Sequence, residues 1–310
     1  MEASLSPAAS EGINLSAEFV CFRKEKLVPR AHNFLSFNSA YKYRPLLLGQ
    51  TKDFCRKNKC ATFTCSQRRE FSVVVGRCID DIYDDLAKRL LPTAAAAASD
   101  PDLKYIIGLA GPPGAGKTTV ASEVVRRLNK LWPQKDSSMD SQVKPADVAA
   151  VLPMDGFHLY RSELDAMENP EEAHARRGAP WTFNPQQLLA CLKTLRSQGS
   201  VYAPSFDHGV GDPVEDDIFV SHQHKVVIVE GNYLLLDDGV WKEISSIFDE
   251  KWFIEIDIDK SMERVLKRHI STGKAPDVAK WRIEYNDRPN AELIMKSKKN
   301  ADLVISSVDF

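Results

Sequence analysis

The chain has 310 residues, of which 43% are hydrophobic and 27% charged, and its formal net charge is −2. This composition is typical of a globular protein and excludes fibrous and fully disordered classes. The sequence contains no run of about 18 apolar residues, so we predict no membrane-spanning helix and no membrane partner. The near balance of acids and bases also argues against nucleic acid as a partner.

Charge is distributed unevenly along the chain. Residues 1–70 hold 12 Lys and Arg against 6 Asp and Glu, whereas residues 71–310 hold 29 against 37. Such asymmetry indicates a separate basic segment at the N-terminus. We predict that residues 1–65 form a basic, disordered extension of the folded protein.

The extension has part of the composition of an organelle-import peptide. From Ala31 to Glu70 the acids are Asp53 and Glu70 alone, and serine is frequent across the first 70 residues. Transit peptides are basic, Ser-rich and poor in acids. We favour import into a chloroplast or another organelle, with Thr64–Ser66 as the processing region. Four glutamates near the N-terminus leave a cytoplasmic extension as the alternative.

Residues 66–100 are expected to hold a helix and a linker. Apolar side chains recur every four residues, which predicts a helix over Phe71–Leu91. Pro92 would end this helix, and Ala94–Ala98 together with Ser99, Asp100 and Pro101 would form an Ala-rich linker. We expect the helix to pack against the domain that follows, residues 101–310.

One motif determines the class of protein. The short apolar run Tyr105–Ala110 predicts a buried strand, and the next eight residues match the P-loop pattern G-x-x-x-x-G-K-[ST]. Glycines let backbone N–H groups surround phosphates, Lys117 reaches the β- and γ-phosphates, and the Thr118 hydroxyl binds Mg²⁺. We therefore predict ATP and Mg²⁺ as cofactors. The predicted nucleotide-binding residues are Gly111, Pro112, Pro113, Gly114, Ala115, Gly116, Lys117, Thr118 and Thr119.

Strands and helices are expected to alternate after the P-loop. The predicted strands are 147–153, 225–229, 252–256 and 301–305, and the predicted helices are 185–198, 240–248, 260–271 and 277–286. This alternation indicates a parallel sheet with helices on both faces. We predict an α/β P-loop NTPase fold with a five-stranded, mainly parallel sheet and a helical lid.

Two carboxylates follow predicted strands. Asp155 follows the second strand and Glu230 follows the third. Ligands in such sheets bind beyond the carboxyl ends of the strands, so both acids should lie beside the P-loop. Glu230 suits the Walker B role of holding Mg²⁺, and Asp155 is then free to act as a general base.

The sequence from Tyr105 to Phe310 resembles the P-loop kinases that include uridine kinase, phosphoribulokinase and bacterial pantothenate kinase. It is most similar to less defined members, including bacterial proteins associated with sugar transport. The resemblance implies that Asp155 is the catalytic base. The stretches that carry it are GPPGAGKTT (111–119), MDGFHL (154–159), RRGAPWTFN (176–184), YAPSFDH (202–208) and VIVEGNYLLL (227–236).

The acceptor side combines features of three relatives. Arg176 and Arg177 stand in a segment similar to one of pantothenate kinase, and Asp207 and His208 in one similar to uridine kinase. His158 resembles a residue of phosphoribulokinase, whereas uridine kinase has Ser-Phe-Tyr after its base. We predict that these five residues contact a polyhydroxy or acidic substrate.

The predicted lid carries two arginines. Arg264 and Arg268 are four positions apart and so share one face of a helix. Cations there would stabilise the transferred phosphoryl group, so we predict catalytic roles for both, together with Asp155 and Lys117. Residues 273–276 could hinge the lid. We leave Lys274, Arg282 and the stretch 285–290 without roles.

Two functions remain open from the sequence. The first is a kinase that phosphorylates a hydroxyl of a small metabolite, such as a nucleoside, a sugar or a pantothenate-like compound. The alternative is a nucleotide-gated binding or assembly protein without a metabolite acceptor. A homodimer also stays open as the oligomeric state.

Overall fold

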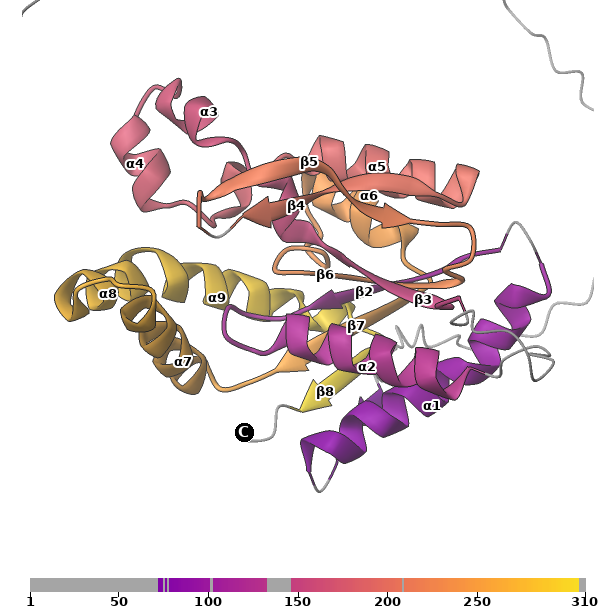
Figure 1. Cartoon of the computed structure of the whole chain (residues 1–310). Helices are drawn as coiled ribbons and strands as arrows, with labels where there is room; N and C mark the ends of the chain where they lie inside the picture. Colours follow the sequence, from indigo (N-terminus) through magenta and orange to yellow (C-terminus); the bar gives the residue numbers. More distant parts are fainter. Residues whose placement is uncertain are drawn as a thin grey trace, which may run out of the picture. The chain divides into compact units, whose positions relative to one another are not determined.

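Figure 1 shows a computed structural model of the chain. It describes residues 72–74, 76, 78–100, 103–132, 146–207 and 209–306. The chain divides into the units Met1–Thr64 and Cys65–Phe310, and all described residues belong to the second. The predicted extension at 1–65 and the predicted processing region Thr64–Ser66 lie outside the described residues, and so does the predicted substrate residue His208.

A six-stranded sheet lies at the centre of the fold, and every neighbouring pair of its strands is parallel. In spatial order the strands are β1 (Ser72–Val74), β8 (Leu303–Ser306), β7 (Glu250–Glu255), β2 (Tyr105–Ala110), β6 (Val226–Gly231) and β3 (Ala149–Pro153). Five of these strands confirm the sequence prediction. The prediction missed β1, because three residues at a sheet edge are too short to give a periodic signal.

Helices cover both faces of the sheet, as predicted. On one face lie α1 (Ile79–Ala98) and α2 (Lys117–Leu131); on the other lie α5 (Pro185–Gln198), α6 (Gly239–Ile247) and α9 (Arg288–Lys296) (Figure 1). Along β2, Ile107 and Leu109 are buried in the core under α1 and α2, whereas Ile106 and Ala110 are buried on the opposite side. Burial on both faces explains why β2 is a continuous apolar run.

The helix predicted over Phe71–Leu91 is wrong at both ends. Residues 72–74 form β1 instead, and α1 continues past Pro92 through the alanines of the predicted linker to Ala98. Alanine has the highest helix propensity, and Ala94 and Ala97 are buried, so this segment stays helical despite the proline. The helix packs against α2 and the sheet as expected.

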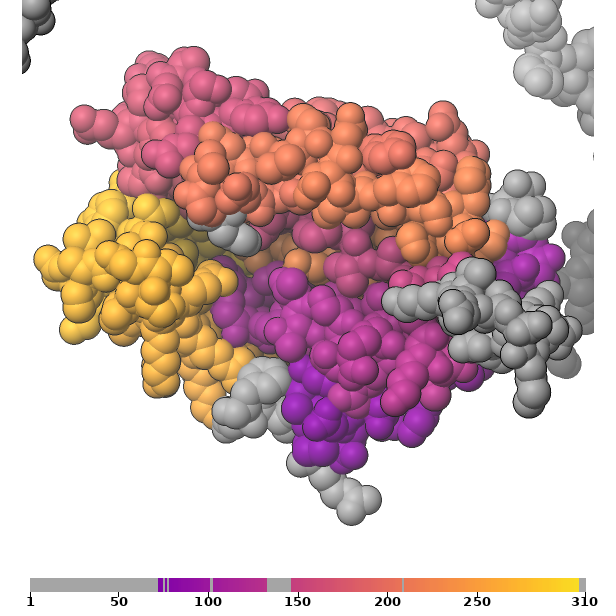
Figure 2. Space-filling view, in the orientation of Figure 1, coloured from indigo at the N-terminus to yellow at the C-terminus, as the bar shows by residue number. Residues whose placement is uncertain are grey.

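The remaining elements surround the carboxyl ends of the strands. They are α3 (Arg161–Asp165), α4 (Pro170–Ala175), the antiparallel hairpin β4 (Val201–Asp207) and β5 (Asp212–Val220), α7 (Ile258–Ser271) and α8 (Pro276–Arg282). The helices α7 and α8 lie where the sequence predicts the helices of the lid, and they lie beside the hairpin (Figure 2). The sequence did not predict the hairpin, since Pro204 and Pro213 interrupt its strand pattern. Within the described ranges, no helix is long and apolar enough to cross a membrane.

Candidate active site

The nucleotide side of the site is the loop 111–116 between β2 and α2, as predicted. Gly114 and Gly116 have φ angles of +77° and +87°, which glycine adopts without strain. A Cβ atom at Gly114 would also come within 2.9 Å of the Ser261 carbonyl oxygen. Among the described residues no side chain caps the N-terminus of α2, so its first N–H groups suit phosphate oxygens.

Lys117 lies between this loop and the two predicted carboxylates. Its Nζ donates a hydrogen bond to the Pro112 carbonyl oxygen at 3.1 Å. Burial lowers the pKa of Lys117, and the charges of Glu230 and Asp155 act in the opposite direction. Both acids are therefore close enough to the P-loop lysine to influence its charge.

Thr118 and Glu230, the two residues predicted to bind Mg²⁺, are in direct contact. Leu109 of β2 is the register partner of Glu230 in β6, which brings the acid to the start of the P-loop. The Thr118 hydroxyl donates to Glu230 Oε1 at 2.9 Å. Burial raises the pKa of Glu230, which is 6% exposed, and Lys117 opposes that shift. Hydroxyl and carboxylate oxygens are the ligands that Mg²⁺ prefers, together with nucleotide phosphates and water.

Asp155 lies in a 3₁₀ turn, Met154–Phe157, directly after β3. Pro153 at the end of β3 is the register partner of Glu230, so the turn lies beside the Thr118–Glu230 pair. The next residue must be small, because a Cβ atom at Gly156 would come within 2.0 Å of the Pro204 carbonyl oxygen. This close packing against β4 fixes the turn that carries Asp155.

A cavity of about 200 Å³ opens next to Asp155 and the P-loop residue Pro113. Its wall combines two carboxylates with several cations and aromatic rings. The lining residues are Pro113, Asp155, His158, Arg177, Gly178, Phe183, Phe206, Asn232, Arg268, His269, Arg282, Asp287 and Asn290. We call this space the acceptor cavity. Four of the residues that the sequence predicts to be catalytic or to contact substrate line it: Asp155, His158, Arg177 and Arg268.

His158 has a fixed orientation in the wall of the acceptor cavity. Its Nδ1 donates to the Asp155 carbonyl oxygen at 2.8 Å. The imidazole packs between Phe183 and Phe206, with centroid distances of 3.9 and 4.6 Å. His158 therefore supports the turn of the predicted base and also faces the acceptor cavity.

The two predicted substrate arginines have different surroundings. Arg177 is largely buried, and its Nη2 donates to the Leu159 carbonyl oxygen at 2.8 Å and to Asp212 at 3.3 Å. Burial lowers the pKa of Arg177. Arg176 does not line the acceptor cavity; its guanidinium lies 5.6 Å from the ring centre of Tyr285.

Asp207 ends β4 and organises the turn of the hairpin. Its Oδ1 accepts hydrogen bonds from the backbone N–H groups of Gly209 and Val210, at 2.7 and 3.1 Å. Asp207 does not line the acceptor cavity, so the structure gives it a local role in the turn.

The predicted lid arginines approach different parts of the site. Arg264 Nη1 donates to the Gly114 carbonyl oxygen of the P-loop at 3.4 Å, whereas Arg268 lines the acceptor cavity. The charge of Arg268 also acts on the pKa of Lys117. Gly273, with a φ of +92°, follows the end of α7, where the sequence predicts a hinge.

The sequence missed a group of polar residues on the lid side. His269 Nε2 and Asp287 Oδ2 are 2.8 Å apart, and both side chains are largely buried. A π-helical turn, Ile283–Asp287, directs Asn286 toward the loop that contains Arg177, and its Nδ2 donates to the Arg177 carbonyl oxygen at 3.0 Å. The polar stretch 285–290 was the available signal, but nothing in it indicates a π turn.

The P-loop, the Thr118–Glu230 pair, Asp155 and the cationic lid meet at the carboxyl ends of one parallel sheet. This fold and site define a kinase of the P-loop class. Residues 106–310 match the Phosphoribulokinase / Uridine kinase family. The chain belongs to this family, which confirms the resemblance seen in the sequence and implies the use of ATP.

Individual relatives agree with the family match. A Schizosaccharomyces pombe protein named "Putative uridine kinase C227.14" is 34% identical over 230 residues, which cover 73% of this chain and 91% of the relative. The Escherichia coli protein YggC is 32% identical over 231 residues, which cover 74% of this chain and 88% of YggC. A crystal structure of a "putative fructose transport system kinase" from Silicibacter sp. TM1040 matches with a TM-score of 0.58 and 28% identity. The match covers 72% of this chain and 98% of that protein.

Proposed function

We propose that the chain transfers the γ-phosphoryl group of ATP to a hydroxyl group of a small metabolite, with Mg²⁺ as the metal. The observation that carries this proposal is the position of Asp155. It lines the acceptor cavity beside Pro113 of the P-loop, and its charge acts on Lys117. A carboxylate in this position can take the proton of an acceptor hydroxyl next to the γ-phosphate.

The proposed transfer follows from these positions. Asp155 accepts the hydroxyl proton, the acceptor oxygen bonds to the γ-phosphorus, and the bond from that phosphorus to the oxygen of ADP breaks. Lys117 and Arg268 stabilise the negative charge of the moving group. Thr118 and Glu230 would hold Mg²⁺, which supplies further positive charge to the phosphates.

The acceptor cavity favours a small, polar substrate. Arg177, Arg268 and Arg282 outnumber the two carboxylates of its wall, and its volume of about 200 Å³ is below that of drug-sized sites. A polyhydroxy or anionic metabolite fits this lining best. The names of the relatives suggest uridine kinase-like or sugar kinase-like acceptors, and the motifs around Arg176 suggest a pantothenate-like one.

The test measures ADP release by the full chain with Mg-ATP and a panel of acceptors. The panel holds uridine, cytidine, pantothenate, fructose, glycerate and ribulose 5-phosphate. We expect one compound to stimulate ADP release at least about tenfold. Lys117→Ala should abolish that stimulation, whereas Lys130→Ala, at the exposed end of α2, should not. Tight ATP binding with no stimulation by any compound would favour the nucleotide-gated binding protein instead.

A further inference from the structure

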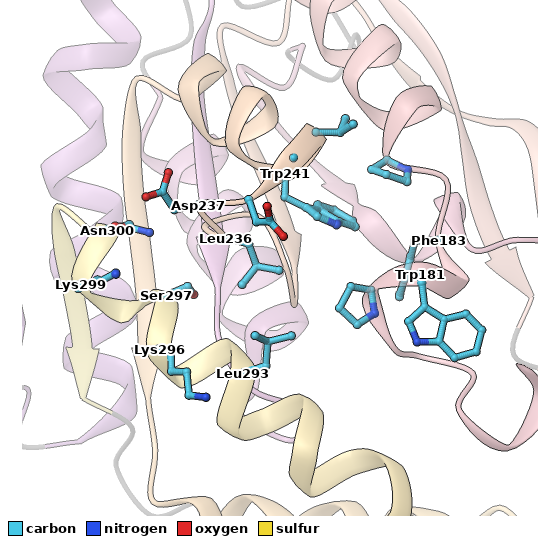
Figure 3. Close-up of a pocket in the computed structure, with 15 residues that line it drawn as sticks. Trp181, Phe183, Leu236, Asp237, Trp241, Leu293, Lys296, Ser297, Lys299 and Asn300 are labelled. Carbon is cyan, nitrogen blue, oxygen red and sulfur yellow. The ribbon is translucent and has the colours of Figure 1, made fainter. Parts of the chain in front are cut away.

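A second, larger cavity of about 470 Å³ lies outside the proposed phosphoryl-transfer site (Figure 3). Its walls come from the segment 180–185, the start of α6 and the end of α9 with the 3₁₀ turn that follows. Its volume falls within the range of small-molecule sites. We call it the aromatic cavity.

The lining of the aromatic cavity has two distinct sides. Figure 3 shows Trp181, Phe183 and Trp241 on one side, and Lys296, Lys299 and Asn300 on the other, with Leu236 and Leu293 between them. Trp181 is 47% exposed, although a large aromatic side chain usually gains from burial. A flat apolar group bound there would cover this indole.

The polar side of the aromatic cavity carries a positive excess. Asp237 is paired with Lys242, whose Nζ lies 3.0 Å from Oδ1. Lys296 and Lys299 form no ion pair within the described part of the chain, and Asp238 is the remaining acid of the wall. Counting Lys242, three lysines therefore face the two aspartates Asp237 and Asp238, and this excess of one positive charge favours an anionic group on this side.

We infer that the aromatic cavity is a second binding site, for a small amphipathic molecule with a flat apolar body and an anionic group. The apolar body lies against Trp181 and Trp241, and the anion lies near Lys296 and Lys299. Phe183 lines both cavities, and its ring centre lies 3.9 Å from that of His158. A molecule bound in the aromatic cavity would therefore contact a side chain, Phe183, that also lines the acceptor cavity.

The experiment is a fluorescence titration of the full chain with 1-anilinonaphthalene-8-sulfonate, which has an aromatic body and one sulfonate. Leu293→Trp fills the middle of the aromatic cavity, and the pair Lys296→Glu and Lys299→Glu reverses the charge of its polar side. The control pair, Lys88→Glu and Lys130→Glu, changes the net charge equally, on α1 and α2 at the other face of the sheet. Thermal unfolding checks that each variant is folded.

We expect saturable binding of one probe molecule per chain. Its Kd should rise at least about tenfold in Leu293→Trp and at least about threefold in the Lys296 and Lys299 pair, with no change in the control pair. If Leu293→Trp does not fold, the lysine pair alone decides. Equal Kd values in the wild type and the lysine pair would overturn the inference, as would an equal loss in the control pair. This binding test does not depend on phosphoryl transfer.

Discussion

The Thr118 hydroxyl donates a hydrogen bond of 2.9 Å to the Glu230 carboxylate, across 112 positions of sequence. The parallel pairing of β2 and β6, with Leu109 opposite Glu230, brings the two residues together. Two separate motifs thus supply the oxygen ligands of one proposed metal site.

Glu230→Gln should weaken the use of Mg²⁺. The amide keeps the shape of the side chain and an acceptor for Thr118 but removes the charge that holds a cation. We expect the Mg²⁺ concentration for half-maximal ADP production to rise at least about tenfold. The matched control is Glu243→Gln, at an exposed position of α6, which should behave as wild type. An unchanged Mg²⁺ requirement in Glu230→Gln would remove Glu230 from the metal site.

The same substitution should stabilise the nucleotide-free protein. Burial raises the pKa of Glu230 above its ordinary value of 4.5, so folding disfavours the ionised carboxylate, and this lowers the free energy of unfolding as the pH rises above that value. Below the ordinary value the carboxyl is neutral in both states, and this cost disappears. Glu230→Gln should therefore have the higher Tm at pH 7.5 in EDTA, with a difference that shrinks as the pH falls toward 4.5. Calorimetry across this pH range measures the difference in Tm. A Tm of Glu230→Gln below that of the wild type at pH 7.5 would contradict the predicted direction of the effect.

The two lid arginines should have separable effects. Arg268 lines the acceptor cavity, so Arg268→Ala should lower kcat by about 100-fold, because charge on the moving phosphoryl group loses a cation. Arg264 contacts the Gly114 carbonyl oxygen, so Arg264→Ala should mainly raise the KM for ATP. Steady-state kinetics distinguish the two. Lys267→Ala, whose exposed side chain pairs with Glu263 at 2.8 Å, is the control. Arg268→Ala with wild-type kcat would refute the lid assignment.

Tyr233 should hold in place the loop that contains Arg177 and Gly178. Its buried hydroxyl donates to the Gly178 carbonyl oxygen at 2.5 Å, next to the Arg177 carbonyl held by Asn286. Tyr233→Phe leaves the Gly178 carbonyl without this donor, which should cost about 1–3 kcal/mol of stability and raise the KM for the acceptor. Urea unfolding and kinetics measure both effects. Tyr202→Phe, 59% exposed on the hairpin, should change neither; equal effects in the two variants would exclude this role.

The fold follows from the sequence where patterns are long and continuous. β2 is apolar throughout because both faces are buried, and α5 begins and ends at the predicted residues Pro185 and Gln198. The edge strand β1 and the end of α1 were not predictable, because the first depends on pairing with β8 and the second on helix propensity that outweighs Pro92.

The site was predictable where a motif fixes both residue type and position. Lys117, Thr118, Glu230 and Asp155 come close together as expected, because each lies at or just beyond the carboxyl end of a parallel strand, and these ends lie at the same edge. Two other contacts depend instead on a π turn: the pair of His269 and Asp287, and the hydrogen bond from Asn286 to the Arg177 carbonyl oxygen. No residue pattern predicts that turn. Asp207 has the residue type of a substrate ligand, but its position at a tight turn gives it backbone partners.

The central claim is that Asp155 takes the proton of the acceptor hydroxyl, whereas the binding of ATP does not depend on Asp155. The most direct measurement compares wild type and Asp155→Asn for acceptor-stimulated ADP release and for ATP affinity. We predict that turnover falls at least about 100-fold, as expected for loss of a general base, while the Kd for ATP changes less than about threefold. Acceptor-stimulated turnover that persists in Asp155→Asn would contradict the account.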